Sequence, residues 1–169
     1  MYYSEFSTPL GTMYAVADSQ HILGLYYQGQ KYCPDMSQYQ YEPEQWLLEA
    51  ATRQIQRYFS DPCFEFDLPL NPNVTSFQKS VLEVLRQIPA GETLSYQQVA
   101  NRLGKPTATR AVASAIAKNP VIIVIPCHRI IGSDGSLVGY AGGLDAKKRL
   151  LRLEGAKNNR DRAQTELFN

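Results

Sequence analysis

The stretch VIIVIPCHR, residues 121–129, places a thiol next to an imidazole at the end of an apolar run. A thiol attacks carbon only as the thiolate, so a reactive Cys127 needs either a lowered pKa or a neighbouring base. His128 is adjacent, but successive side chains of an extended segment point to opposite faces, so a bent backbone or a bridging water must join the two groups. Pro126, which cannot donate to a strand ladder, favours such a bend. The residue types predict a nucleophile and a base.

A histidine that acts as a base usually depends on an acidic group that fixes its tautomer. Glu154 is a candidate, because it lies directly before Gly155, the residue expected just past the end of a helix in DAKKRLLRLEG, where the helix dipole disfavours a carboxylate. The residues alone favour an exposed Glu154 paired with a nearby Lys or Arg. Both interpretations remain open at this point.

Several elements must position these groups. The Val and Ile run at 121–125 has no polar face and predicts a strand covered on both sides. Helical spacing of apolar residues predicts a helix over 76–88, and a capping box of Ser95 and Gln98 opens a second helix that ends at Gly104. A third helix is expected over 107–118. Two short helices joined by a tight turn are typical of a helix-turn-helix, a pattern also common in proteins that never touch DNA.

The third helix carries a surface of small residues. It can pack closely on a neighbouring helix or press onto a duplex, and the cation of Arg110 near its start favours the duplex. The small residues are Ala108, Ala111, Ala113, Ser114, Ala115 and Ala117.

The sequence predicts a small α+β scaffold in the first part of the chain. Alternating residues on either side of a Ser-Gln turn predict a hairpin from 12–18 and 21–28, and strict alternation in FEFDLPL predicts a half-buried strand at 64–70. Between them, an apolar stripe predicts a helix over 44–59. The proline-rich LPLNPN ends this part, so we expect domains at 1–73 and 74–155 and a tail at 156–169.

Charge differs sharply between these parts. Residues 1–73 hold 3 Lys and Arg against 9 Asp and Glu, a net charge of −6, whereas residues 74–155 hold 11 against 5, a net charge of +6, and the tail is +1. Such asymmetry suggests that the second part meets a polyanion, of which nucleic acid is the obvious case.

The sequence gives little support for a membrane segment, a disulfide framework or a metal site. No stretch is long enough to cross a bilayer and the start lacks a signal sequence, so we expect a cytoplasmic protein with no membrane partner. Three cysteines far apart argue against a disulfide framework. A zinc site from His21, Cys33 and Cys63 is conceivable but lacks the usual ligand spacing.

The motifs IPCHRII and GYAGGL, with Asn119-Pro120 before them, KKRLLRLEG after them and SYQQVA upstream, resemble the O6-alkylguanine-DNA alkyltransferases. The resemblance is close over residues 74–155. It implies an α+β protein with an N-terminal ribonuclease-H-like domain and a C-terminal winged-helix-like helix-turn-helix domain. It also implies single-turnover DNA repair, in which Cys127 takes a methyl or other alkyl group from O6 of guanine.

The resemblance also implies roles for individual residues. His128 would activate Cys127 through a water and Glu154 would orient His128, while Asn119 would act as a hinge and Tyr140 would protonate the leaving guanine. Base flipping would expose the lesion, since its O6 lies in the major groove and the protein enters the minor groove. The expected DNA-binding residues are Tyr96, Arg110, Ala111, Ser114 and Arg129.

No cofactor and no metal is expected, because the first part lacks the Cys and His pattern of the zinc-containing relatives. The expected partner is double-stranded DNA that contains O6-alkylguanine, bound by a monomer. The alternative is an alkyltransferase-like protein that binds lesions without transfer, but such proteins carry tryptophan at the acceptor position, where this chain has Cys127. The range of alkyl groups, activity on O4-alkylthymine and cooperativity on DNA stay open.

Overall fold

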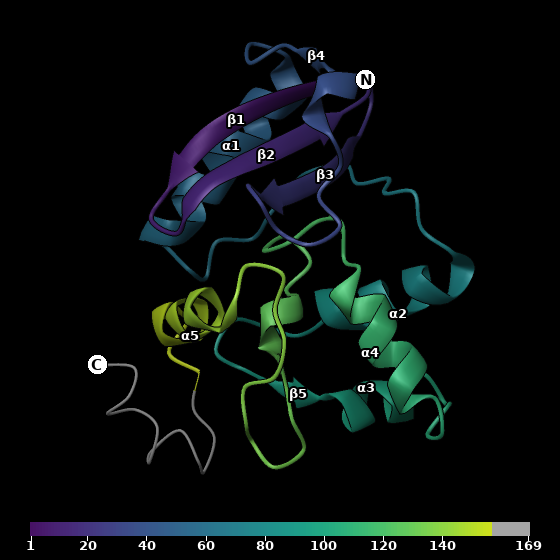
Figure 1. Cartoon of the computed structure of the whole chain (residues 1–169). Helices are drawn as coiled ribbons and strands as arrows, with labels where there is room; N and C mark the ends of the chain where they lie inside the picture. Colours follow the sequence, from purple (N-terminus) through teal and green to yellow (C-terminus); the bar gives the residue numbers. More distant parts are fainter. Residues whose placement is uncertain (157–169) are drawn as a thin grey trace. The chain divides into compact units, whose positions relative to one another are not determined.

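The computed structural model describes residues 1–156 (Figure 1), so all but the first residue of the expected tail at 156–169 lies outside the described residues. The chain forms two compact units. The first unit contains Met1–Asn73 and Pro120–Val124, and the second contains Val74–Asn119 and the described residues from Ile125 onward. Residues 120–124 thus lie in the first unit, although the sequence analysis groups them with the second. No helix of residues 1–156 has the length and apolar character needed to cross a membrane.

The first unit is built on a four-stranded sheet with the order β3-β2-β1-β4. Strands β1, β2 and β3 are antiparallel neighbours, which confirms the expected hairpin, and β4 pairs in parallel with the start of β1. Residues alternate in exposure along β1, so one face of the sheet contributes to the core. The strands are β1 (Tyr2–Thr8), β2 (Gly11–Ala17), β3 (Ile22–Tyr27) and β4 (Gln40–Tyr41).

Helix α1 (Trp46–Ser60) packs on this sheet and confirms the helix expected at 44–59. The side chain of Gln45 accepts hydrogen bonds from the N–H groups of Leu47 and Leu48 and so caps the helix. The buried stripe of α1 consists of Leu47, Leu48, Ala51, Ile55 and Tyr58.

The strand expected at 64–70 is wrong. Only Leu70 forms a bridge, to Ile22, and the rest of the segment has no ladder. Instead, the side chain of Gln54 bonds both the N–H and the carbonyl of Asp67, and the ring of Phe66 lies against Tyr58. The alternation therefore reports which side chains are buried, while a side-chain amide takes the place of a partner strand.

The second unit is mainly helical (Figure 1), so the molecule as a whole has the expected α+β class. Capping boxes begin α2 and α3, and that of α3 is the expected pair Ser95 and Gln98. The two-stranded pair β5 and β6 is parallel. The elements are α2 (Ser76–Arg86), β5 (Leu94–Ser95), α3 (Tyr96–Arg102), α4 (Thr109–Ala117), the 3₁₀ helix η2 (Cys127–Arg129), β6 (Ile130–Ile131) and α5 (Leu144–Leu153).

Helices α3 and α4 form the helix-turn-helix. Gln97 fixes the turn between them, because its amide donates to Asn101 and to the carbonyl of Pro106 and accepts from Thr109. Gly104 ends α3 with a φ of +69°, a backbone conformation that glycine adopts at little cost. These bonds and the glycine therefore fix the conformation of the turn between the two helices.

The run at 121–125 is buried but is not a strand. Val121 bridges Leu25 within the first unit, and then Ile123 takes a φ of +71°, which turns the chain. The N–H of Val124 bonds the carbonyl of Ile122 in a tight turn, so the backbone is satisfied without a ladder. A left-handed conformation is costly for a β-branched residue, on the order of 1–3 kcal/mol, and persists only where the surroundings impose it.

Candidate active site

Cys127 begins η2, directly after Pro126, and its side chain is almost fully buried. Burial raises the pKa of the thiol, and a hydrogen bond with Asn119 and the positive charge of Lys147 offset only part of this effect. At neutral pH the resting group is therefore the thiol, and a base must take its proton before it can attack.

His128 is the buried neighbour that can act as this base. Its Nε2 lies 2.9 Å from Oε2 of Glu154, and its Nδ1 has no hydrogen-bond partner among the described residues. Burial lowers the pKa of His128, so the imidazole is neutral at neutral pH. Because the carboxylate accepts from Nε2–H, the lone pair stands on Nδ1, and this nitrogen is the one that can accept a proton.

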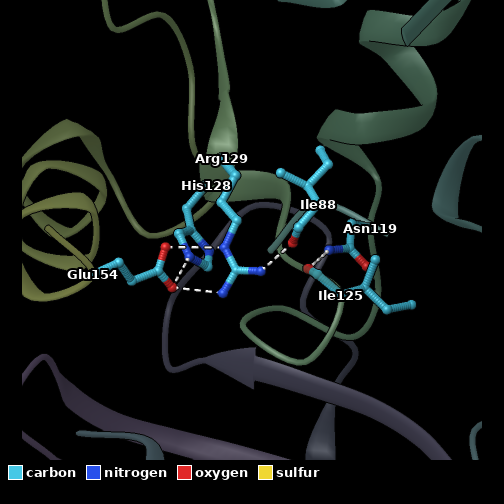
Figure 2. A network of polar contacts seen from close by, with 6 residues as sticks. All are labelled: Ile88, Asn119, Ile125, His128, Arg129 and Glu154. Atoms are coloured by element: carbon cyan, nitrogen blue, oxygen red, sulfur yellow. Dashed lines mark hydrogen bonds and ion pairs between the residues drawn. The ribbon is translucent and has the colours of Figure 1, made fainter. Parts of the chain in front are cut away.

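Glu154 anchors the network shown in Figure 2. Arg129 donates to both carboxylate oxygens, from Nε to Oε1 at 2.9 Å and from Nη2 to Oε2 at 2.8 Å. Burial by itself raises the pKa of Glu154, but His128 and Arg129 outweigh it and hold the pKa at about 2. The alternative of an exposed surface Glu154 is wrong, because the side chain is 0% exposed.

The end of α5 fixes the position of Glu154. The N–H of Gly155 bonds the carbonyl of Arg152, and the N–H of Ala156 bonds that of Leu151, the two bonds of a Schellman motif. Gly155 has a φ of +67°, as this motif requires. Ala156 and Leu151 also share an apolar cluster. Although the helix dipole disfavours a carboxylate here, the pair with Arg129 compensates for it.

Arg129 is not placed to bind DNA. The side chain is 11% exposed, and Nη1 donates to the carbonyl of Ile88 at 2.5 Å while the other two nitrogens bind Glu154 (Figure 2). All three guanidinium nitrogens are thus engaged within the second unit. The sequence analysis placed Arg129 among the expected DNA-binding residues, but a positive charge does not distinguish a phosphate contact from a buried ion pair.

Asn119 closes the loop that leads to Cys127. Its side-chain amide donates to the carbonyl of Ile125 at 2.8 Å, so the two ends of segment 119–125 are held together (Figure 2). The same side chain interacts with the Cys127 thiol. Asn119 therefore links the end of α4 to the start of η2.

Two tyrosines border the thiol and the imidazole. The ring of Tyr140 meets that of His128 edge to face, with centroids 6.3 Å apart. Tyr96 donates its hydroxyl to the carbonyl of Val138 at 3.1 Å. Burial raises the pKa of Tyr96, with a smaller contribution from Cys127, so Tyr96 remains a protonated phenol at neutral pH.

Lys147 is a site residue that the sequence analysis missed. It lies on α5 with no exposed surface, and burial lowers the pKa of its amine to about 8, although Cys127 opposes the shift. Its spacing was the available signal, because Lys147, Leu150, Leu151 and Glu154 follow the i, i+3, i+4, i+7 pattern of a single helix face. A lysine within an apolar stripe requires a reason to be buried.

The exposed face of α4 differs from these buried groups. Its small residues Ala111, Ser114 and Ala117 lie between the exposed cations Arg110 and Lys118. Val112, Ala115 and Ile116 point into the unit instead. This face of α4, with small residues between two cations, is exposed, so packing on a neighbouring helix does not account for the small residues.

Among residues 1–156, no group of three or more His, Cys, Asp or Glu side chains is placed to hold a metal ion. Nδ1 of His21 instead lies 3.8 Å from Oδ1 of Asp18, and the two side chains are 41% and 40% exposed.

Comparison with known families finds a match to each part of the chain. Residues 76–156 match the model described as 6-O-methylguanine DNA methyltransferase, DNA binding domain. Residues 1–72 match the model described as 6-O-methylguanine DNA methyltransferase, ribonuclease-like domain.

Individual relatives and structures agree with these models. A methylated-DNA--protein-cysteine methyltransferase of Methanosarcina acetivorans is 41% identical over 92% of this chain and 99% of the relative. One of the same name from Haemophilus influenzae is 36% identical over 91% and 86%. The crystal structure of Mycobacterium tuberculosis OGT in complex with DNA superposes with a TM-score of 0.85 at 35% identity, covering 92% of this chain and 93% of that one.

Proposed function

Since the chain belongs to the 6-O-methylguanine DNA methyltransferase family, we propose that it repairs DNA by transferring the alkyl group on O6 of guanine directly to the sulfur of Cys127. The transfer is irreversible, so each molecule acts once. One observation carries the assignment to this residue. The buried Cys127 thiol is followed by a neutral imidazole that is bonded on its other side to a carboxylate of low pKa.

The proton of the thiol must move before sulfur attacks. Nδ1 of His128 accepts it, directly or through one water, and Nε2–H continues to donate to Glu154, whose charge stabilises the imidazolium. The buried ion pair with Arg129 keeps Glu154 ionised throughout. Arg129 is therefore a positioning residue of the site rather than a DNA contact.

The transfer step forms one bond and breaks one. The thiolate sulfur of Cys127 forms a bond to the alkyl carbon while the bond from this carbon to O6 breaks, and the electron pair passes to guanine. The hydroxyl of Tyr140 gives its proton to N3 of the base and regains one from the His128 imidazolium, which the ring contact between the two supports. Guanine leaves neutral, and Cys127 is left as a thioether.

The exposed face of α4 is the surface that we assign to DNA. Its small residues, Ala111 and Ser114 among them, allow the helix backbone to approach the minor groove closely, and Arg110 is exposed at its first turn to enter the stack in place of the flipped nucleotide. Extrusion of the base costs a few kcal/mol, and less for an alkylated base that pairs poorly. Tyr96 lies near the thiol, where it can contact the extruded nucleotide. We propose a monomer as the acting species.

Mass spectrometry of the intact protein tests this assignment. After incubation with duplex DNA that contains O6-methylguanine, we expect one added methyl group on the peptide that holds Cys127. Cys127→Ala should abolish transfer and leave DNA affinity nearly intact, whereas Cys63→Ala, at an exposed cysteine, should transfer normally. Methyl transfer by Cys127→Ala, or repair of several lesions by one molecule, contradicts the proposal.

A further inference from the structure

Helix α4 begins without a side-chain cap, unlike the two helices before it. Thr75 and Ser95 each accept a hydrogen bond from the N–H three residues ahead and so cap α2 and α3. The matching position of α4 is Ala108, which has no side-chain acceptor. Because alanine is a poor residue at this position, the first turn of α4, which carries Arg110, needs support from elsewhere.

Helix α3, a neighbour of α4 in the second unit (Figure 1), supplies this support through Gln97. Oε1 of Gln97 accepts from the hydroxyl of Thr109, the first residue of α4, at 2.8 Å. Nε2 donates to the carbonyl of Pro106 at 2.8 Å and to Oδ1 of Asn101, one turn further along α3, at 3.0 Å. One amide therefore holds both the connection between the helices and the start of the second helix.

The apolar face of α4 does not fix the start of the helix. Its buried residues are Val112, Ala115 and Ile116, and the first of them lies three positions after Thr109. Thr109 and Gln97 are themselves half-buried, so the hydrogen bond between them lies at the edge of the unit rather than in its core. Packing thus fixes the middle and the end of α4, and the pair of Gln97 and Thr109 adds the tie at its first turn.

We propose, on the basis of the alkyl-transfer function above, that Gln97 and Thr109 are positioning residues for the DNA-dependent part of the reaction. Their hydrogen bond holds the first turn of α4, so the exposed Arg110 next to Thr109 starts from a restricted set of positions when it replaces the flipped nucleotide. A side chain whose backbone is placed in advance loses less conformational freedom on binding. Because both side chains are uncharged, the pair has this effect without contributing to the net charge of +6 on residues 74–155.

The pair should leave the chemistry at sulfur unaffected. Its hydrogen bonds join α3, the turn and α4, whereas Cys127 lies on η2 and the neighbouring His128 is bonded to Glu154 at the end of α5. A small free base, O6-benzylguanine, needs no residue to fill a gap in a duplex. When the bond between Gln97 and Thr109 is removed, we therefore expect slower transfer from duplex DNA and unchanged transfer from the free base.

The test compares single-turnover rates of the full-length protein with a duplex that contains O6-methylguanine and with free O6-benzylguanine. Thr109→Val keeps the shape of the side chain without the hydroxyl and should slow transfer from the duplex about fivefold, the effect of one hydrogen bond of ordinary strength. Thr109→Ser keeps the hydroxyl and should retain most of the rate. Both variants should react with the free base as fast as the unmodified protein does.

Two double variants test whether the pair acts as a unit and through Arg110. Gln97→Met removes the amide at similar size and should slow transfer from the duplex at least as much as Thr109→Val does. Adding Thr109→Val to Gln97→Met, or to Arg110→Ala, should then slow transfer little further, because the bond or the guanidinium on which it acts is already lost. Full additivity in either double variant overturns the inference.

Gln54→Met is the matched control. The amide of Gln54 likewise bonds a backbone N–H and a carbonyl, those of Asp67 in the first unit. Gln54→Met should lower the temperature of thermal unfolding, as Gln97→Met does, and leave transfer from the duplex unchanged. If Gln97→Met does not fold, the comparison of Thr109→Val with Thr109→Ser decides alone, and equal rates for these two variants overturn the inference.

The unmodified protein and the free base separate the two proposals. If the unmodified protein transfers no methyl group from the duplex to Cys127, the proposed function fails. If it transfers normally and the variants at Gln97 and Thr109 keep the duplex rate, or lose the free-base rate to the same extent, the inference about this pair fails while the function stands.

Discussion

His128 and Glu154 are ionisable groups without exposed side-chain surface, so folding fixes their protonation states. The folded chain holds the imidazole neutral because of burial, and it holds the carboxylate charged because His128 and Arg129 outweigh the effect of burial. The neutral imidazole has a lone pair that can accept the proton of the Cys127 thiol, and the ionised carboxylate can stabilise the imidazolium that forms.

These pKa values predict how stability depends on pH. The pKa of His128 is lower in the folded state than its usual 6.5, so the unfolded chain binds a proton first and stability falls as the pH drops below about 6.5. The Glu154 pKa of about 2 lies below its usual 4.5, so its contribution is complete above pH 4.5 and is lost between pH 4.5 and about 2.

Urea unfolding midpoints between pH 8 and 2 measure both effects. His128→Asn should remove the loss between pH 6.5 and 4.5, whereas His21→Asn, at an exposed histidine, should retain it. A midpoint that stays constant from pH 7 to 5 in the unmodified protein contradicts a neutral, buried His128.

At the scale of single residues, the sequence indicated a candidate nucleophile and a candidate base but not their surroundings. Cys127 and His128 are recognisable because few residue types do this chemistry. Arg129 was assigned to DNA and Lys147 was missed, because a cation can bind DNA, a carboxylate or a carbonyl. Burial decides among these partners, and the residue type alone does not report it.

At the scale of elements, local signals in the sequence were reliable where hydrogen bonds are local. The capping boxes, the turn at Gly104 and the end of α5 at Gly155 all follow from bonds within a few residues. The strands predicted at 64–70 and 121–125 are absent from the structure, because a strand needs a partner strand that is distant in the chain. Periodicity reports which side chains are buried, and it does not report where the backbone bonds go.

The two helix-ending glycines allow a matched test of the α5 terminus. Gly155 and Gly104 have φ values of +67° and +69°, and a Cβ at either position meets nothing within 4 Å. Gly155→Ala and Gly104→Ala should therefore cost similar stability, about 1 kcal/mol each.

Only one of these glycines lies next to Glu154. Gly155→Ala should therefore also slow the reaction of Cys127 with free O6-benzylguanine, which needs no DNA, while Gly104→Ala should leave that rate near normal. Thermal unfolding and the rate of benzyl transfer are the two measurements. Equal rates for both variants would mean that the Schellman motif does not position the carboxylate.

At the scale of the molecule, the charges are divided between the two parts. The +6 of residues 74–155 predicts that affinity for duplex DNA falls as salt rises, since each neutralised phosphate releases counter-ions. Arg110→Ala should make the slope of log affinity against log salt shallower by about one. Arg57→Ala, an exposed cation of the first unit, should leave the slope unchanged. Fluorescence anisotropy at several salt concentrations checks this, and binding indifferent to salt rejects it.

The segment 120–124 restricts how the molecule can be recombined with its relatives. Pro120 and Ile122 bond the backbone of Leu25 in β3, while Asn119 and Ile125 belong to the second unit. A chimera that exchanges residues 1–73 alone therefore leaves a foreign pentapeptide against the transplanted sheet. A faithful graft must exchange two separate pieces of the gene, the second of them ending two codons before the codon for Pro126.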